Sequence, residues 1–285
     1  MTLSIEIGSK EWKDLRRTKI TSTDAASILG IGYLTPYQLW LRKITGEEEK
    51  DNPAMKRGRD LEDTARKIFE ADYGVKVHPE VVLHSKHDWL MTTLDGINVR
   101  RGELVEIKCP GNKNHEKALS GKIPEIYVPQ LQHHLMVSGL KELTYMSYCP
   151  DHAQPIKYID VLEDKAYIEA MFEKEKDFYE LMVKMVPPDL TESDCIEIYD
   201  PEYLKAAQEW LESNAMVKAW QFKEEAAKGV LKRFADKHNV IGANVKVASH
   251  VRSGLVDYKA IPMLKGVDIE QYRKSPSRVF TISVA

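Results

Sequence analysis

The stretch Leu104-Val105-Glu106-Ile107-Lys108-Cys109-Pro110 decides the fold that we expect for this chain. It indicates a short apolar strand over 104–108, which the Pro110-Gly111 pair ends. Because side chains alternate across a strand, Glu106 and Lys108 point to one face and their apolar neighbours to the other. An edge strand with a solvated side has the same pattern. The alternative is a carboxylate and an ammonium group held at a cleft for metal-assisted hydrolysis.

The preceding strand, expected over 89–99, reaches Asp95-Gly96, which by itself is a strong turn signal. The short link over 99–102 predicts a hairpin with 104–108, and this pairing brings Asp95 close to Glu106. Mg²⁺ prefers hard oxygen ligands and is typically held by one or two carboxylates. Lys108 would then orient or deprotonate a bound water, or offset charge in the transition state.

A third carboxylate, Glu62, lies early on a helix expected over 54–71 and flanks its apolar stripe. The alternative is a surface acid that interacts favourably with the helix N-terminus, a role that Asp60 and Asp63 fit better.

The helix expected over 126–138 carries Gln130 and Gln132, whose amides suit phosphate or base contacts, or else the edge of the core. His133 and His134 are adjacent and therefore point in different directions. No Cys or His lies nearby at metal-ligand spacing, so we expect no zinc site.

The composition limits the class of protein. The chain has 285 residues, a formal net charge of −3 and three cysteines. It is not a generically basic protein, so any DNA contact needs local positive charge. The segment 10–19 is a candidate, although composition alone favours the alternative of a solvated helix face. Three cysteines give no disulfide framework and fit a reducing cytosol, and they are too few for a four-cysteine iron–sulfur cluster. We expect a cytoplasmic protein without a membrane span, and no ATP hydrolysis because a GxxxxGK[ST] loop is missing.

The order of elements predicts an α/β sandwich with a mixed sheet. We expect a helix-rich segment over 15–29 with Thr21 or Ser22 as N-cap, and a helix beginning at Thr35-Pro36. Further expected strands are 75–83, 143–148 and 157–161, followed by a helix over 164–185.

The polar, proline-containing stretch 186–194 predicts a boundary between a domain over 1–190 and an α+β extension over 195–285. In the extension we expect a long helix from Asp200-Pro201 to about 238, a hairpin of 245–251 with 255–258, and a closing strand over 278–284. Trp210 and Trp220 are expected to pack in a core, with an interface as the alternative.

Five elements together make a resemblance visible. They are the segment 12–25 with Leu15-Arg16 and Ile20-Thr21-Ser22-Thr23-Asp24-Ala25, then Arg57-Gly58-Arg59-Asp60-Leu61-Glu62, Leu94-Asp95-Gly96, Glu106-Ile107-Lys108-Cys109-Pro110 and Gln130-Leu131-Gln132. In this order they resemble the YqaJ-type viral recombinase family, which includes lambda exonuclease and belongs to the PD-(D/E)xK nuclease superfamily. The resemblance covers about 11–186 and implies a restriction-endonuclease-like core with a central mixed sheet flanked by helices. Leu94 stands where the superfamily often has proline, which affects backbone shape and not the metal ligand.

The resemblance implies a role for each matching residue. Asp95, Glu106 and the backbone carbonyl of Ile107 would bind Mg²⁺, with Mn²⁺ expected to substitute. Lys108 would activate the attacking water, and Glu62 would sit at a second metal or its water. Arg16, Thr23 and Gln130 resemble a pocket for the 5′-phosphate, with Ser22 and Gln132 as further candidates.

The implied activity is a 5′→3′ exonuclease, encoded by a phage or prophage, that acts on the ends of linear double-stranded DNA. It would release mononucleotides and leave a 3′ single strand for a single-strand annealing protein. A ring-shaped trimer is the oligomer that the family implies. The alternative function is an endonuclease of restriction or repair on the same fold, and a non-catalytic DNA-binding protein is a third hypothesis, which the intact set of acids and lysine disfavours.

Overall fold

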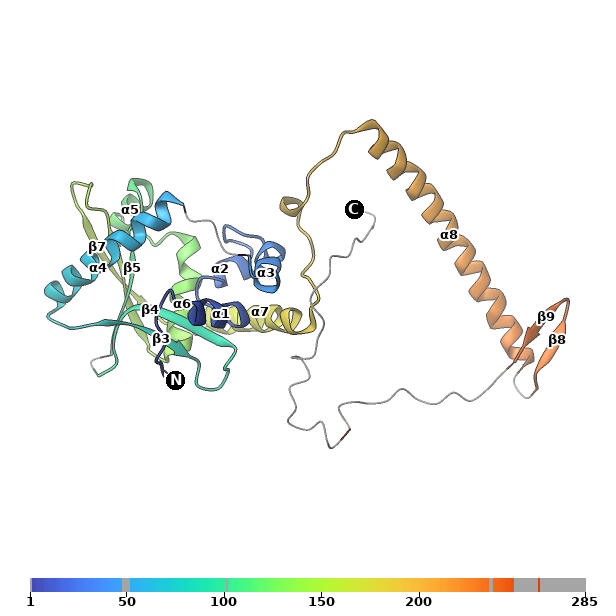
Figure 1. Cartoon of the computed structure of the whole chain (residues 1–285), viewed down its shortest axis with the longest axis horizontal. Helices are drawn as coiled ribbons and strands as arrows, with labels where there is room; N and C mark the ends of the chain where they lie inside the picture. Colours follow the sequence, from blue (N-terminus) through green and yellow to red (C-terminus); the bar gives the residue numbers. More distant parts are fainter. Residues whose placement is uncertain (1, 48–51, 101, 236–237, 249–260, 262–285) are drawn as a thin grey trace. The chain divides into compact units, whose positions relative to one another are not determined.

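The computed structural model describes residues 2–47, 52–100, 102–235, 238–248 and 261 (Figure 1). The chain divides into two compact units, Met1–Cys195 and Ile196–Ala285. The expected strands over 255–258 and 278–284 lie outside the described residues.

Within the described part of the first unit, seven strands form one mixed sheet in the order β1-β3-β4-β5-β6-β7, with β2 paired to β4. The β5–β6 and β2–β4 pairs are parallel, and the other neighbours are antiparallel. The strands are β1 (Thr2–Leu3), β2 (Ile20–Thr21), β3 (His78–Leu83), β4 (Leu90–Asn98), β5 (Glu103–Lys108), β6 (Glu142–Tyr148) and β7 (Ile156–Leu162). The predicted mixed sheet is confirmed.

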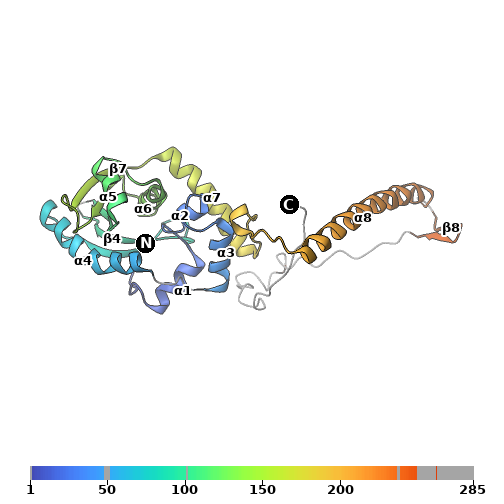
Figure 2. The same ribbon diagram turned by 90° about the horizontal axis from the view of Figure 1, so that it is seen from above.

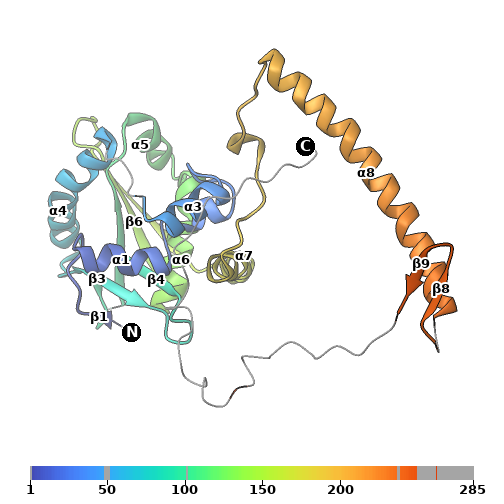
Figure 3. The same ribbon diagram turned by 45° about the vertical axis from the view of Figure 1, so that its right-hand side comes forward.

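Helices flank this sheet on both faces. They are α1 (Lys10–Thr18), α2 (Ala25–Ile28), α3 (Pro36–Thr45), α4 (Pro53–Tyr73), α5 (Asn112–Leu119), α6 (Val128–Ser138) and α7 (Lys165–Lys184), with short 3-10 turns at Glu125–Tyr127 and Glu192–Asp194. Figure 3 shows α4 on one side of the sheet and α6 and α7 on the other. Seen from above, α1, α2 and α3 gather beside the sheet, and α3 contacts both α1 and α2 (Figure 2).

Two apolar clusters match these two layers. On the α6 and α7 side, Leu131 and Leu135 pack with Leu90 and Leu94 of β4. On the α4 side, Phe69 and Ala65 pack with residues of β5 and β6, including Val105. The sheet is therefore buried on both faces, which explains why Leu104 to Ile107 are all buried although side chains alternate along the strand.

Local chemistry fixes the helix ends. Thr35 closes a capping box with Gln38 at the start of α3, which confirms the predicted start at Thr35-Pro36. The predicted helix-rich segment over 15–29 is confirmed in part, since 15–18 belong to α1 and Ala25–Ile28 form α2, but the N-cap predicted at Thr21 or Ser22 is wrong. The chain leaves α1 at Lys19 in an extended conformation, and Ile20 and Thr21 pair with β4 instead. These two residues are β-branched and buried, which favours a strand, and Asp24 is the N-cap of α2.

The second unit contains α8 (Pro201–Phe234) and a hairpin of β8 (Val240–Gly242) and β9 (Val245–Val247). The long helix is confirmed. Among the described residues β9 pairs with β8, which was not expected, and the expected partner 255–258 lies outside the described residues. Trp220 is 66% exposed and no described residue of α8 is buried, so the prediction that Trp220 packs in a core is wrong. No helix in the described ranges is both long and apolar enough to span a membrane.

Candidate nuclease site

A bulge in β4 places Asp95. His78 and Glu80 of β3 face Ile97 and Leu94 of β4, so a two-residue step on β3 opposes a three-residue step on β4. The extra residue falls at Asp95-Gly96, and β4 continues to Asn98 rather than ending in a turn. Bulges re-aim side chains next to active sites. A Cβ at Gly96 would lie 2.8 Å from methyl carbons of both Val105 and Val77, so only glycine fits here without a shift.

The β4–β5 hairpin joins Asp95 to the strand that carries Glu106 and Lys108. Gly96 faces Val105 in the antiparallel register, as the short 99–102 link predicted. Oδ2 of Asp95 accepts a hydrogen bond from the backbone N–H of Ile107 at 2.9 Å. Asp95 therefore lies beside Glu106 and Lys108 because of backbone pairing, and its carboxylate is fixed by β5.

Glu106 is buried at the centre of the cluster. Its Oε1 accepts hydrogen bonds from Nζ of Lys108 and Nε2 of Gln130, each at 2.6 Å. Its Oε2 lies 2.9 Å from Nε2 of His134, a contact that is an ion pair when His134 is protonated. The predicted shared face of Glu106 and Lys108 is confirmed, and α6 adds two side chains to it.

His134 is a residue of the cluster that the sequence reasoning missed. Its Nδ1 lies 2.6 Å from Oγ1 of Thr92, and the ring is fully buried. The spacing of Gln130 and His134 by four residues places both on one helix face, and this was the available signal. The neighbouring His133 points elsewhere, to Glu175 (2.8 Å) and the carbonyl of Met91 (3.1 Å).

Glu62 approaches the same cluster from α4. Nη2 of Arg66 lies 2.5 Å from Oε1 of Glu62, and Nε of Arg66 donates to the carbonyl of Asp95 at 2.8 Å. Arg66 thus links Glu62 to the bulge. Burial and the nearby charge of Glu106 raise the pKa of Glu62, although Arg66 opposes this shift.

The buried charges act on one another. Burial, together with the charges of Glu106 and Glu62, raises the pKa of Asp95 well above its ordinary value. Burial also disfavours the Glu106 carboxylate, but Lys108 and His134 outweigh it and lower the pKa of Glu106 to about 2. Burial would lower the pKa of Lys108, yet the charges of Glu106 and Asp95 raise it above its ordinary value. Lys108 is therefore a protonated donor in this arrangement.

The donor set suits a hard divalent cation. Three carboxylates that repel one another and share one buried region are relieved by a cation, and carboxylate oxygens are the ligands that Mg²⁺ and Mn²⁺ take. Oε2 of Glu106 is a buried oxygen that lies 2.9 Å from Nε2 of His134, and a carboxylate oxygen with one such neighbour keeps a lone pair for a cation. In the same described ranges, no three His, Cys, Asp or Glu side chains already stand in a metal-binding arrangement. The residues thus fit the ion by chemistry, without a preformed cage.

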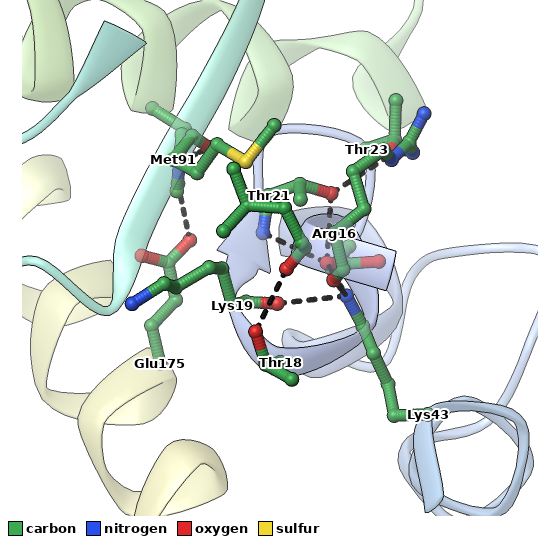
Figure 4. Close-up of polar contacts among 11 residues, drawn as sticks. Arg16, Thr18, Lys19, Thr21, Thr23, Lys43, Met91 and Glu175 are labelled. Carbon is green, nitrogen blue, oxygen red and sulfur yellow. Dashed lines mark hydrogen bonds and ion pairs between the residues drawn. The ribbon is translucent and has the colours of Figure 1, made fainter. Parts of the chain in front are cut away.

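A second polar group surrounds Arg16. Nη2 of Arg16 donates to Oγ1 of Thr23 at 2.7 Å (Figure 4). The guanidinium also lies over the ring of Trp12, 4.4 Å from its centroid. Nε1 of Trp12 in turn donates to Thr93 of β4 at 3.1 Å. The structure brings together Arg16 and Thr23, whereas Gln130 is bonded to Glu106.

Two weaker candidates have other environments. Ser22 is buried while Thr23 is exposed, so Thr23 is the hydroxyl that a ligand can reach. Gln132 is 4% exposed, and its amide joins the carbonyl of Leu162 (3.0 Å) to the N–H of Asp164 (2.9 Å). The suggestion that Gln132 contacts DNA is therefore wrong, because both ends of its amide hold β7 to α7, and the core-edge alternative holds.

A family comparison agrees with this geometry. Residues 11–141 match the YqaJ-like viral recombinase domain. This YqaJ-like domain includes the acidic cluster, which is formed by Glu62, Asp95 and Glu106, and the Arg16 group, which is formed by Arg16 and Thr23. The resemblance noted from the sequence is confirmed. The uncharacterized protein YqaJ of Bacillus subtilis (strain 168) is 34% identical over 140 residues, which are 47% of this chain. The match spans 44% of that relative, so less than half of its length is shared.

Solved structures share the fold of the YqaJ-like domain. The alkaline exonuclease LHK-Exo from Laribacter hongkongensis superposes with a TM-score of 0.56 at 23% identity, over 71% of this chain and all of that one. LHK-Exo in complex with dAMP gives a TM-score of 0.55 at 23% identity, over 62% of this chain and 94% of that one. At this identity the likeness establishes a common mixed α/β fold.

Proposed function

We propose that the first unit is a metal-dependent deoxyribonuclease that degrades linear duplex DNA from its 5′ ends. The observation that carries the proposal is the position of Glu106, whose carboxylate lies against Lys108, Gln130 and His134 next to Asp95. The YqaJ-like match and the fold shared with an alkaline exonuclease support the same class of reaction.

Asp95, Glu106 and the carbonyl of Ile107 would hold Mg²⁺ or Mn²⁺, with Glu62 at a second ion or its water. When bound, the ion supplies Lewis-acid activation of the phosphodiester and of water. The chain's own residues do the positioning: Gln130 and His134 fix the Glu106 carboxylate, and Ile107 fixes that of Asp95.

Lys108 has the geometry of a donor. Because Glu106 and Asp95 raise the pKa of Lys108, its ammonium group carries a proton in the free protein. We assign it to orienting the attacking water and to stabilising negative charge on the phosphoryl oxygens. Proton removal from the water by Lys108 requires that the charges of its two carboxylate neighbours be neutralised first.

The proposed direction of digestion rests on Arg16 and Thr23. A guanidinium and an exposed hydroxyl within 2.7 Å of each other suit the oxygens of a terminal phosphate. An enzyme that begins at an end needs such a pocket, whereas an endonuclease does not. Digestion from the 5′ end would leave a 3′ single strand, the substrate of an annealing protein. For processive digestion we propose a ring-shaped homotrimer, which sedimentation of the full chain would test.

The test uses full-length protein, Mg²⁺ and three substrates: linear duplex labelled at the 5′ end, the same duplex labelled at the 3′ end, and a closed circle. We expect the 5′ label to leave as mononucleotide, the 3′ label to stay on long strands and the circle to survive. Cutting of the circle would replace the proposal by the endonuclease alternative. Lys108→Met protein serves as the control for contaminating nuclease, and an undigested set of all three substrates would refute nuclease activity of the isolated chain.

A further inference from the structure

Lys43 of α3 is buried, and its ammonium group donates a hydrogen bond to each of three acceptors. Its Nζ donates to the carbonyl of Arg16 at 2.8 Å and to the carbonyl of Lys19 at 2.9 Å, and it lies 2.5 Å from Oδ2 of Asp24 (Figure 4). Both side chains of the ion pair are less than a tenth exposed. An ammonium group has three donors, so the site satisfies this lysine completely.

The two carbonyls belong to the C-terminal end of α1. The last carbonyls of a helix have no partner within it, and a positive charge there is favoured by the helix dipole. Lys43 therefore caps α1 from another helix. Because one of the bonded carbonyls is that of Arg16, this cap fixes the backbone from which the Arg16 side chain extends.

Asp24 fixes the other half of the same pocket. Its Oδ2 accepts from both the backbone N–H (2.8 Å) and the hydroxyl (2.7 Å) of Thr21. Oγ1 of Thr21 lies 3.0 Å from Oγ1 of Thr23. Since the Thr21 proton is given to a carboxylate, Thr23 donates to Thr21, and this orients Thr23 to accept from Arg16 at 2.7 Å.

These contacts close a ring from Lys43 to the backbone and side chain of Arg16, then through Thr23, Thr21 and Asp24 back to Lys43. We propose that Lys43 and Asp24 are positioning residues that hold Arg16 and Thr23 in the geometry that recognises a 5′-phosphate. Both are buried, so they act without touching DNA. The inference rests on the proposed 5′-end pocket, and it adds two residues to which neither the motifs nor the comparisons give a role.

The ring is also tied to the strand that carries Asp95. Thr21 faces Met91 in the parallel β2–β4 pair, and Thr93 of β4 holds Trp12 under Arg16. Thr93 lies two residues before Asp95. A shift of the pocket relative to β4 would therefore move a bound 5′-terminal phosphate relative to the acidic cluster.

Binding measured without divalent metal tests the inference independently of nuclease activity. The probe is a short blunt duplex with a 3′ fluorophore, in 5′-phosphorylated and 5′-hydroxyl forms, titrated in EDTA with full-length wild type, Lys43→Met and Thr21→Val proteins. Thr21→Val removes the hydroxyl link while leaving the Lys43–Asp24 pair, which keeps the test valid if Lys43→Met fails to fold. Lys184→Met is the matched control, because Lys184 pairs with Glu180 on an exposed part of α7.

We expect both ring variants to lose about tenfold or more of the preference for the phosphorylated end, since small misplacements of a binding group have large effects. Binding of the hydroxyl end should stay within about twofold, as in the control. Combining Lys43→Met with Arg16→Ala should give no further loss beyond Arg16→Ala alone, because one residue acts through the other. Equal weakening on both ends, additive losses, or wild-type protein without any end preference would overturn the inference. The ring variants keeping the wild-type preference would also overturn it. If the wild type prefers the phosphorylated end, the ring variants lose that preference and no protein digests DNA, the nuclease is refuted while the positioning role stays supported.

Discussion

Nε2 of His134 lies 2.9 Å from Oε2 of Glu106, and the opposite nitrogen of the same ring lies 2.6 Å from the hydroxyl of Thr92. One buried imidazole thus connects α6, β4 and the central carboxylate on β5. The Thr92 contact fixes the ring orientation, and the ring then limits rotation of the carboxylate. Such outer contacts commonly decide how well a carboxylate holds a metal.

We therefore predict that His134→Ala lowers the turnover of linear duplex by about 10- to 100-fold, the range typical of residues that orient a metal ligand. Thr92→Val should have a smaller effect, because it removes only the group that orients the ring. Initial rates over a Mn²⁺ titration measure both variants. Wild-type rates for His134→Ala at every Mn²⁺ concentration would rule out this positioning role.

The acidic cluster should oppose folding when no cation is present. Asp95→Asn removes one of three mutually repelling carboxylates, of which Glu106 is buried and Asp95 and Glu62 are partly buried. We therefore expect a higher thermal unfolding midpoint in EDTA together with loss of nuclease activity. Added Mn²⁺ should raise the midpoint of the wild type and change that of the variant much less. Differential scanning calorimetry with and without Mn²⁺ makes the comparison. An equal metal response of both proteins would remove Asp95 from the ligands.

Lys108→Met should leave the fold intact and reduce turnover by about 10²-fold or more, the usual size of a lost group that stabilises transition-state charge. The thermal midpoint and circular dichroism spectrum check the fold, and end-labelled duplex reports the rate. Exposed Lys184, paired to Glu180, supplies the matched control substitution. A Lys108→Met enzyme that retained more than a third of wild-type turnover would be incompatible with the role assigned here.

The bulge gives a prediction about stability alone. Gly96→Ala forces a methyl group to within 2.8 Å of Val105 and Val77, so we expect a loss of about 1–3 kcal/mol, as for other overpacked sites. Gly58 on α4 has no atom within 4 Å of an added Cβ, and Gly58→Ala should instead stabilise the helix by up to about 1 kcal/mol. Urea unfolding of the two variants compares them, and equal free energies of unfolding would show that the bulge tolerates a side chain.

The buried His133–Glu175 pair predicts how stability depends on pH. Burial disfavours the charged ring, but Glu175 outweighs it and raises the pKa of His133 above its ordinary value; Asp24 acts in the same direction. A raised folded-state pKa contributes stability that is fully present below the unfolded value of about 6.5 and is lost as pH rises through the folded value. Burial and the charges of His87 and His133 lower the pKa of His84, so His84 acts on stability in the opposite sense.

The thermal midpoint should accordingly fall as the pH is raised above about 6.5, and Glu175→Gln should flatten this dependence while lowering the midpoint at acidic pH. Scanning calorimetry between mildly acidic and alkaline buffer measures it. The same slope in the wild type and in Glu175→Gln would show that another group is responsible.

The sequence by itself determined the strand around Glu106, the shared face of Glu106 and Lys108, the hairpin with the Asp95 strand and most helix bounds. These follow from side-chain alternation, capping residues and short links, which act over a few neighbours. The polar helix α5 has no apolar stripe that would mark it, and no expectation covered it.

Tertiary structure alone decided the rest. The bulge at Asp95-Gly96 exists because β3 and β5 both pair with β4, so a dipeptide that signals a turn becomes part of a strand. Ile20-Thr21 becomes a strand because β4 offers a partner edge to two residues that a local reading assigns to a helix. Gln132 was a candidate for the site and His134 was not, yet His134 is the residue that contacts Glu106. Helix spacing tells which residues share a face, but it does not tell which face meets the carboxylate. Lys43 and Asp24 lie 19 positions apart, and only packing of α3 against α1 and α2 brings their charges into contact.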